Sequence, residues 1–191
     1  MVIDSQAVIL VAAARRFADY GYCKTTMAEI ADDCDMSVGN LYRHFRSKEA
    51  LAVACMSHQM AAKLATGLDA ARKETDALAA LQCFLLVRLR IGHDHFANTR
   101  HLFDMMAMIN ARHRDLLLRH EAQVIEAIAG MLEQGVAQGQ FACDDTRQTA
   151  YDIHQATLRY NSPVNLKYNE LSLLEADLQR LVTLLYRGLR C

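Results

Sequence analysis

The side chains best suited to chemistry lie between residues 25 and 48, where polar, aromatic and cationic residues are gathered into a short stretch. Asn40 can present a donor and an acceptor together, which is the pairing that suits an adenine edge. Tyr42 and His44 can donate hydrogen bonds to phosphate oxygens, and Arg43 can contact either a phosphate or a base. This combination of residue types predicts contact with double-stranded DNA.

Five further residues extend the same candidate site. The Thr26 hydroxyl can donate to a phosphate, and the Ser37 hydroxyl can reach a phosphate or a base. Val38 can touch a thymine methyl group, while Gly39 lacks a side chain and lets a helix approach the floor of the groove. Lys48 begins a predicted helix, where its ammonium and the free helix amides attract the same phosphate.

A structural interpretation of the same residues is that Tyr42 covers a small core and that the nearby cations form an ordinary solvated face. That interpretation leaves Gly39 and Asn40 unexplained, because both are poor helix formers and both occupy the middle of a very short predicted helix. We therefore favour contact with DNA.

Helical periodicity predicts the elements that position these residues. The helix-favouring pattern, the capping box formed by Thr26 and Glu29, and the caps at Ser37 and Ser47 indicate a helix, a tight turn at Asp35 and a second helix. About nine helices are expected in all, covering 4–20, 26–34, 37–44, 47–67, 75–91, 98–109, 113–138, 145–162 and 172–189, with Gly92 as the stop of the fifth. No strand-like alternation of useful length occurs, so the predicted fold class is all-α.

Residues 9–51 resemble the DNA-binding domain of the TetR family. The resemblance rests on Phe17, Gly21 and Tyr22, on 25–31 (TTMAEIA), on 37–45 (SVGNLYRHF) and on 47–51 (SKEAL). It implies an N-terminal three-helix helix-turn-helix domain, here 1–47, and a larger helical ligand-binding and dimerisation domain, here 48–191. It also implies a homodimeric, ligand-responsive transcriptional regulator, usually a repressor, that binds a pseudo-palindromic operator and is released by a small-molecule effector.

The composition fits a globular protein of this kind. The chain has 191 residues, 52% of them hydrophobic and 23% charged, and its net charge of −1 argues against indiscriminate coating of nucleic acid. No span is long enough for a membrane helix and no signal peptide is evident, so we expect a cytoplasmic protein with no membrane partner. The six cysteines include no Cys-x-x-Cys pair, and free thiols are expected.

The C-terminal part contains candidate effector-binding residues of adaptable or bulky apolar character, with one cation and one imidazole among them. They are Met60, Phe84, Arg88, Phe103, Met106 and His154. Arg88 interrupts an apolar helix and could pair with an anionic effector, with a carboxylate such as Asp104, or extend to solvent. Methionines at helical spacing could equally fill a core.

The last predicted helix carries a leucine stripe that includes Leu174, Leu178, Leu181 and Leu185. Its apolar surface extends around the cylinder, which indicates burial on more than one side. We interpret the stripe as a homodimer contact, and a central helix of a single chain is the alternative.

Eight histidines, including His93, His95 and His154, raise a second possibility. The chain would then be a helical metal- or haem-binding protein, or a sensor whose effector site uses histidines. His93 and His95 could share a metal only in a loop, and His113 and His120 lie beside arginines on a predicted solvated face. No nucleophile, phosphate loop or acid–base pair stands out, so we predict no enzyme, no metal and no cofactor.

Overall fold

The computed structural model describes residues 5–97, 99 and 101–189, and within these ranges every regular element is a helix. The chain forms two compact units. The first contains the described residues up to Met60 together with Thr99–Leu117, and the second contains Ala61–Ala97 and the described residues from Leu118 onward. The domain boundary expected at 47–48 remains a prediction, because α4, which begins there, contributes residues to both units.

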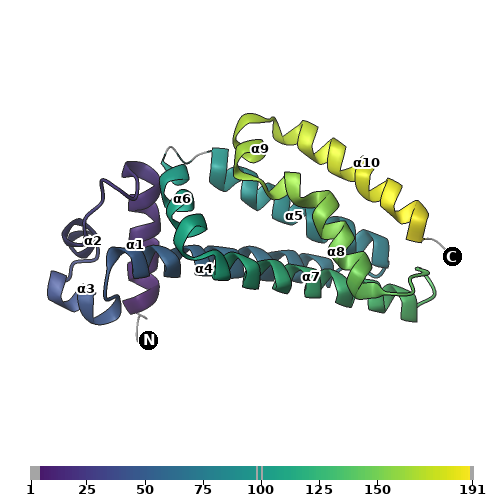
Figure 1. Cartoon of the computed structure of the whole chain (residues 1–191), viewed down its shortest axis with the longest axis horizontal. Coiled ribbons are helices and arrows are strands. Elements are labelled where there is room, and N and C mark those ends of the chain that lie inside the picture. The colour runs from purple at the N-terminus through teal and green to yellow at the C-terminus, as the bar shows by residue number, and fades with distance from the viewer. Residues whose placement is uncertain (1–4, 98, 100, 190–191) are drawn as a thin grey trace. The chain divides into compact units, whose positions relative to one another are not determined.

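The first unit is built from short helices around α1 (Ser5–Tyr20) (Figure 1). They are α2 (Met27–Asp33), α3 (Val38–His44), the first half of α4 (Lys48–Ala71) and α6 (Leu102–Arg112). The predicted capping box at Thr26 and the predicted cap at Ser37 are both confirmed. Asp35 has a φ of 52°, so the turn does place an aspartate in the left-handed region.

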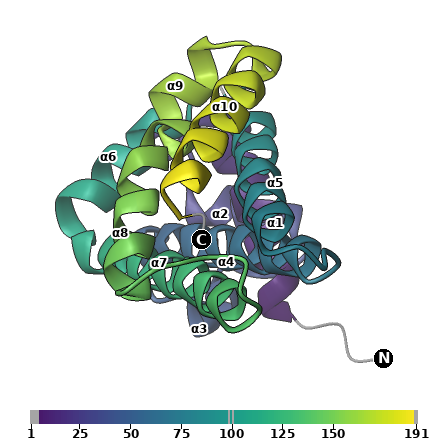
Figure 2. The same ribbon diagram turned by 90° about the vertical axis from the view of Figure 1, so that its right-hand side faces the viewer.

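The second unit contains the longer helices α5 (Ala77–Ala97), α7 (Arg114–Ala137), α8 (Thr146–Thr157) and α10 (Leu171–Leu189), with the end of α4. Helix α5 packs against α9 (Pro163–Tyr168) and α10 (Figure 2). Fully buried residues such as Phe84, Ile128, Leu132 and Leu166 form its core.

Two predicted boundaries were wrong in this unit. Helix α5 does not stop at Gly92 but continues to Ala97. A Cβ atom at Gly92 would lie 2.8 Å from Lys63 Nζ and 2.9 Å from Leu166 Cδ1, so this glycine allows close packing inside a helix. The segment expected as one helix over 145–162 is α8 followed by a 3₁₀ turn, Leu158–Asn161, and α9 then begins at Pro163, where a missing N–H costs nothing. The described residues thus form ten α-helices rather than nine.

Candidate nucleic-acid interface and effector site

The turn between α2 and α3 is held by a small apolar core. Ile30, Ala31 and Leu41 are fully buried, and Phe17 of α1 is almost so. Leu41 is the only residue of α3 that is buried, and its position on the inner face turns the rest of this helix outward. Leu41 is therefore the residue of α3 that anchors this helix in the small core.

The outer face of α3 carries the residues expected to contact DNA. Val38, Gly39, Tyr42 and Arg43 are exposed, and Tyr42 shows 49% of its surface to solvent. Asn40 and His44 are half-buried. Ser37 is also exposed, and its Oγ accepts a hydrogen bond from the Asn40 backbone N–H at 3.2 Å. We call these seven residues, 37–40 and 42–44, the α3 surface.

Gly39 is the most informative member of the α3 surface. A Cβ atom at this position would meet no other atom within 4 Å, so nothing in the described part of the chain requires a glycine here. A glycine inside a helix costs about 1 kcal/mol relative to alanine. The space above Gly39 is therefore available to a molecule other than this chain.

Thr26 and Lys48 are bonded within the protein itself. The Thr26 hydroxyl donates to Glu29 Oε2 at 2.8 Å. The Lys48 ammonium donates to three backbone carbonyls, those of Tyr22 at 2.8 Å, Thr25 at 2.9 Å and Cys23 at 3.4 Å. It also lies 4.6 Å from the centre of the Tyr22 ring. Lys48 thus fastens the segment between α1 and α2 to the start of α4.

Acidic residues that precede the α3 surface are neutralised by a cation from α1. Arg16 donates to both carboxylate oxygens of Asp33, at 2.5 and 2.8 Å, and lies 3.3 Å from Glu29. The hydrogen bonds from Arg16 hold the pKa of the Asp33 carboxyl below its usual value. In the described chain neither Arg43 nor Arg46 is in an ion pair, so these cations remain available to a phosphate.

The start of α4 is also joined to the end of α6. Glu49 accepts from Arg112 Nη1 at 3.0 Å, and its other carboxylate oxygen lies 2.8 Å from His113 Nε2. The hydrogen bond with His113, and then that with Arg112, lowers the pKa of Glu49. His113 is therefore a half-buried hydrogen-bond partner of Glu49 inside the first unit, and the solvated face expected for it was wrong.

The six predicted effector residues divide between the two units. Met60, Phe103 and Met106 belong to the first, and Phe103 is exposed there, which disfavours a role in an enclosed site. The other three are Phe84, Arg88 and His154, which are all buried in the second unit. The Arg88 guanidinium lies 5.1 Å from the centre of the Phe84 ring. The structure thus brings Phe84 and Arg88 into contact.

Two of the three expectations for Arg88 can be judged from its surroundings. Only 3% of its surface is exposed, so the side chain does not extend to solvent. Asp104, the suggested carboxylate partner, is exposed and belongs to the first unit. Within the described ranges Arg88 forms no ion pair, and its Nε atom has no hydrogen-bond partner. An anionic effector remains as the partner to be considered.

The predicted dimer stripe needs a correction. Leu174 and Leu178 are 2% and 1% exposed and belong to the core of their own unit, against which Leu181 and Leu185 also pack. Leu174 and Leu178 are enclosed by their own unit and cannot at the same time contact a second copy, whereas Leu181 and Leu185 are half-buried and remain a predicted part of the dimer contact. The leucines that α10 exposes are Leu173 and Leu184, at 64% and 62%.

The metal-site hypothesis finds little support in the same structure. His93 and His95 lie inside α5, whereas sharing a metal would require a loop. In the part of the chain that the structure describes, no three or more residues of the types His, Cys, Asp and Glu are grouped so as to hold a metal ion. Five cysteines are free thiols, and Cys191 lies outside the described residues.

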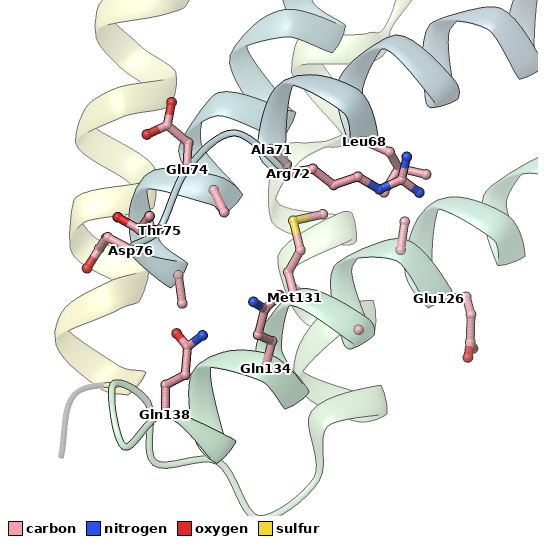
Figure 3. A pocket seen from close by; sticks show the side chains of 14 residues that line it. Leu68, Ala71, Arg72, Glu74, Thr75, Asp76, Glu126, Met131, Gln134 and Gln138 are labelled. Atoms are coloured by element: carbon pink, nitrogen blue, oxygen red, sulfur yellow. The ribbon is translucent and has the colours of Figure 1, made fainter.

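One groove on the second unit lies away from all of the predicted effector residues (Figure 3). The loop residues Glu74, Thr75 and Asp76 border it on one side, and Gln134 and Gln138 of α7 border it on the other. Apolar side chains contribute to its wall about as much as charged and amide side chains do. A ligand site is usually lined mostly by apolar side chains, so we do not assign the effector to this groove.

An all-helical chain with a helix-turn-helix and an outward-facing second helix defines the class of helix-turn-helix transcriptional regulators. Residues 9–55 match the family of bacterial regulatory proteins, tetR family, and residues 77–182 match the tetracyclin repressor-like C-terminal domain. Because the second match spans more than half of the sequence, the chain belongs to the TetR family.

Individual relatives agree with this assignment. The HTH-type transcriptional regulator RutR of Escherichia coli strain K12 is 29% identical over 160 residues, covering 83% of this chain and 74% of RutR. The A-factor receptor protein of Streptomyces griseus is 47% identical over 51 residues, which are 27% of this chain and 18% of that protein. A TetR transcription regulator from Haloarcula marismortui has the same fold, with a TM-score of 0.76 at 18% identity over 98% of this chain and 99% of the other.

The chain is accordingly a DNA-binding transcriptional regulator and not an enzyme. None of the described helices combines the length and the apolar character needed to span a lipid bilayer.

Proposed function

We propose that this protein is a ligand-responsive transcriptional repressor that binds a pseudo-palindromic operator as a homodimer. The observation that carries this proposal is the α3 surface, which is exposed and has unoccupied space above Gly39. In a helix-turn-helix protein the second helix enters the major groove, and a dimer contacts half-sites about 34 Å apart. Repression, rather than activation, is the usual role in the TetR family, and we expect the protein to act in the cytoplasm.

The homodimer face that we propose lies on α8 and α10. Both helices expose large apolar side chains: Tyr151 and Leu158 at 45% and 41% on α8 and the turn after it, and Leu173 and Leu184 on α10. A second copy of the chain would remove these side chains from water at a gain of about 25 cal/mol for each Å² of apolar area. This face replaces the one made by Leu174 and Leu178.

Release from the operator would follow from effector binding in the second unit. Since α4 contributes residues to both units, a displacement of its second half can be transmitted to the half that begins at Lys48. An effector can shift this equilibrium only by as much as it prefers the non-binding conformation.

Substitutions on the α3 surface test DNA recognition. Tyr42→Phe removes a phosphate donor and is expected to weaken binding to every sequence about equally. Asn40→Ala is expected to relax the preference at one base position by about 1–3 kcal/mol. An operator is first selected from random-sequence DNA, and each variant is then titrated by fluorescence anisotropy on single-base variants of it. An unchanged sequence preference in Asn40→Ala would contradict a base contact.

A substitution of Lys48 tests a different role. The Lys48 ammonium already donates hydrogen bonds to three backbone carbonyls. We propose that Lys48 positions the segment before α2 rather than contacting a phosphate. Lys48→Met should then lower stability by about 1.5 kcal/mol, the lower end of the range for hydrogen bonds to charged groups. DNA affinity should fall while its dependence on salt stays as in the wild type.

The control for Lys48→Met is Lys24→Met, which removes a nearby exposed lysine with no such bonds. Both variants are measured by thermal unfolding and by anisotropy at several salt concentrations. If Lys48 instead neutralised a phosphate, its removal would reduce the slope of log K against log salt by about 0.9.

A further inference from the structure

The interior of the second unit contains an arginine without a counterion. Arg88 is 3% exposed, its Nε atom has no hydrogen-bond partner, and the residues that the structure describes provide no carboxylate for its guanidinium. Its nearest aromatic neighbour is the fully buried Phe84 ring. A buried charge is costly unless it is paired, so an isolated arginine at this depth requires an explanation.

A second cation from another helix lies close to Arg88. The Lys63 ammonium of α4 donates to Asn161 Oδ1 at 2.9 Å, and this neutral amide is the partner that the structure gives it. Burial, and then the positive charge of Arg88, lowers the pKa of Lys63 to about 7. A carboxylate beside these two groups would have the opposite effect, because an opposite charge favours the charged form.

Two imidazoles complete the cluster. His154 is 6% exposed, and its Nε2 atom lies 3.3 Å from Glu121 Oε1 but outside hydrogen-bonding geometry. The Nδ1 atom of His120 is buried and also unpartnered. Burial, followed by the charges of Arg88 and Lys63, lowers the pKa of His120 to about 4. His120 is thus half-buried, and its Nδ1 atom is turned away from the solvent that the sequence predicted for it.

The one carboxylate near these groups, Glu121, lies beside His154, and among the described residues it forms no ion pair with Arg88 or Lys63. Its side chain is 34% exposed, and the oxygen that lies near His154 also accepts from Gln155 Nε2 at 3.2 Å. Four helices, α4, α5, α7 and α8, thus contribute cationic or protonatable groups to one apolar interior without a buried carboxylate among the described residues.

We propose that this cluster is the effector site and that the effector is a small organic carboxylate. Its carboxylate would pair with the Arg88 guanidinium, whose planar fork matches two oxygens, and would accept from the Lys63 ammonium. Its apolar part would lie against Phe84 and Leu166, which are both fully buried. The inference rests on the proposed function only in naming the bound molecule as the effector.

The packing around the cluster limits the size of this molecule. A Cβ atom on Gly67 would lie 3.0 Å from Arg88 Cγ and 3.1 Å from Phe84 Cδ2, and one on Gly92 would lie 2.8 Å from Lys63 Nζ. Both helices therefore approach the two cations as closely as a glycine allows. Such close packing favours a monoanion with a short carbon chain over a bulky or doubly charged molecule, whose desolvation would cost more.

The test compares acids with their neutral amides on the free protein. Straight-chain monocarboxylates of two to eight carbons, the matching amides and inorganic phosphate are titrated at constant ionic strength, by thermal unfolding and by calorimetry. We expect at least one carboxylate to raise the unfolding temperature and to bind at least tenfold more tightly than its amide. Equal binding of acid and amide, a stronger effect of phosphate, or no response to any carboxylate would overturn the proposal.

Two arginine variants of α5 separate a binding role from a structural one. Arg88→Met should abolish the response to the carboxylate and should leave the free protein as stable as the wild type or more so, because it removes an unpaired buried charge. Arg90→Met removes an exposed arginine that is paired with Glu175, and it should keep the full response. A destabilised Arg88→Met variant that still responds to the carboxylate would overturn the assignment.

The unfolding and calorimetric titrations are made without DNA, so their results do not depend on the proposed repressor function. Operator binding is followed separately by anisotropy. If no operator can be selected but the carboxylate response depends on Arg88, the anion site stands and the proposed function fails. If the operator is bound but no carboxylate binds to the free protein, the DNA-binding function stands and the proposed carboxylate site fails.

Discussion

Leu41→Ala is expected to lower the free energy of unfolding by about 2–5 kcal/mol and to abolish sequence-specific DNA binding. The Leu41 side chain is closed to solvent, with 0% of its surface accessible, and it is the one buried residue of α3. Its truncation removes apolar packing and leaves a cavity between α3 and the neighbouring helices. The orientation of the α3 surface would then no longer be determined. Chemical denaturation and anisotropy with the selected operator measure the two effects.

Val38→Ala is the matched control for this prediction. Val38 lies on the same helix, but it is 36% exposed and contributes to the outer face. A surface substitution usually changes stability by no more than about 0.5 kcal/mol, so Val38→Ala should fold normally. An unfolding free energy for Leu41→Ala within this margin of the wild type, with operator binding retained, would show that α3 is held by other contacts.

Gly135→Ala and Gly130→Ala are expected to differ in stability by about 1–3 kcal/mol, although both add one methyl group to α7 and gain the same helix propensity. A Cβ atom at Gly135 would lie 2.3 Å from Phe141 Cδ2 and 2.9 Å from the Ala77 Cβ. Phe141 is 2% exposed and contacts the Tyr186 ring, so it has little freedom to move away. Gly135→Ala should therefore be destabilised by overpacking.

Gly130 provides the comparison because a Cβ atom there would meet nothing within 4 Å. Gly130→Ala should stabilise the protein by up to about 1 kcal/mol through its higher helix propensity. Denaturant titrations of both variants and the wild type give the order of the three stabilities. Equal stabilities of the two variants would mean that α7 and Phe141 do not pack as described.

Local sequence patterns specify much of the N-terminal unit. The reciprocal hydrogen bonds of Thr26 and Glu29, the cap at Ser37 and the left-handed Asp35 all involve residues within three positions of one another. Such interactions depend on side-chain chemistry and spacing, both of which can be read from the sequence. The family resemblance over 9–51 rests on the same local features, and the family it named is the one to which the chain belongs.

Long-range packing assigns the roles of several other residues. Gly92 has the features of a helix stop, but it is the place where Lys63 and Leu166 approach α5. Leu174 and Leu178 have the spacing of an interface stripe, but their own unit covers them. Periodicity shows which face of a helix is apolar, yet it cannot show whether that face is covered by the same chain or by another.

The cluster of Arg88, Lys63, His120 and His154 shows most clearly that sequence patterns do not reveal long-range packing. A lysine or histidine on an amphipathic helix is normally solvated, so nothing in the sequence distinguishes Lys63 or His120 from the other charged residues. Both are half-buried because helices that come from distant parts of the chain pack around them. The order of residues specifies the local turns and caps, because those involve near neighbours. Which charges are left without a partner depends on how distant helices pack together.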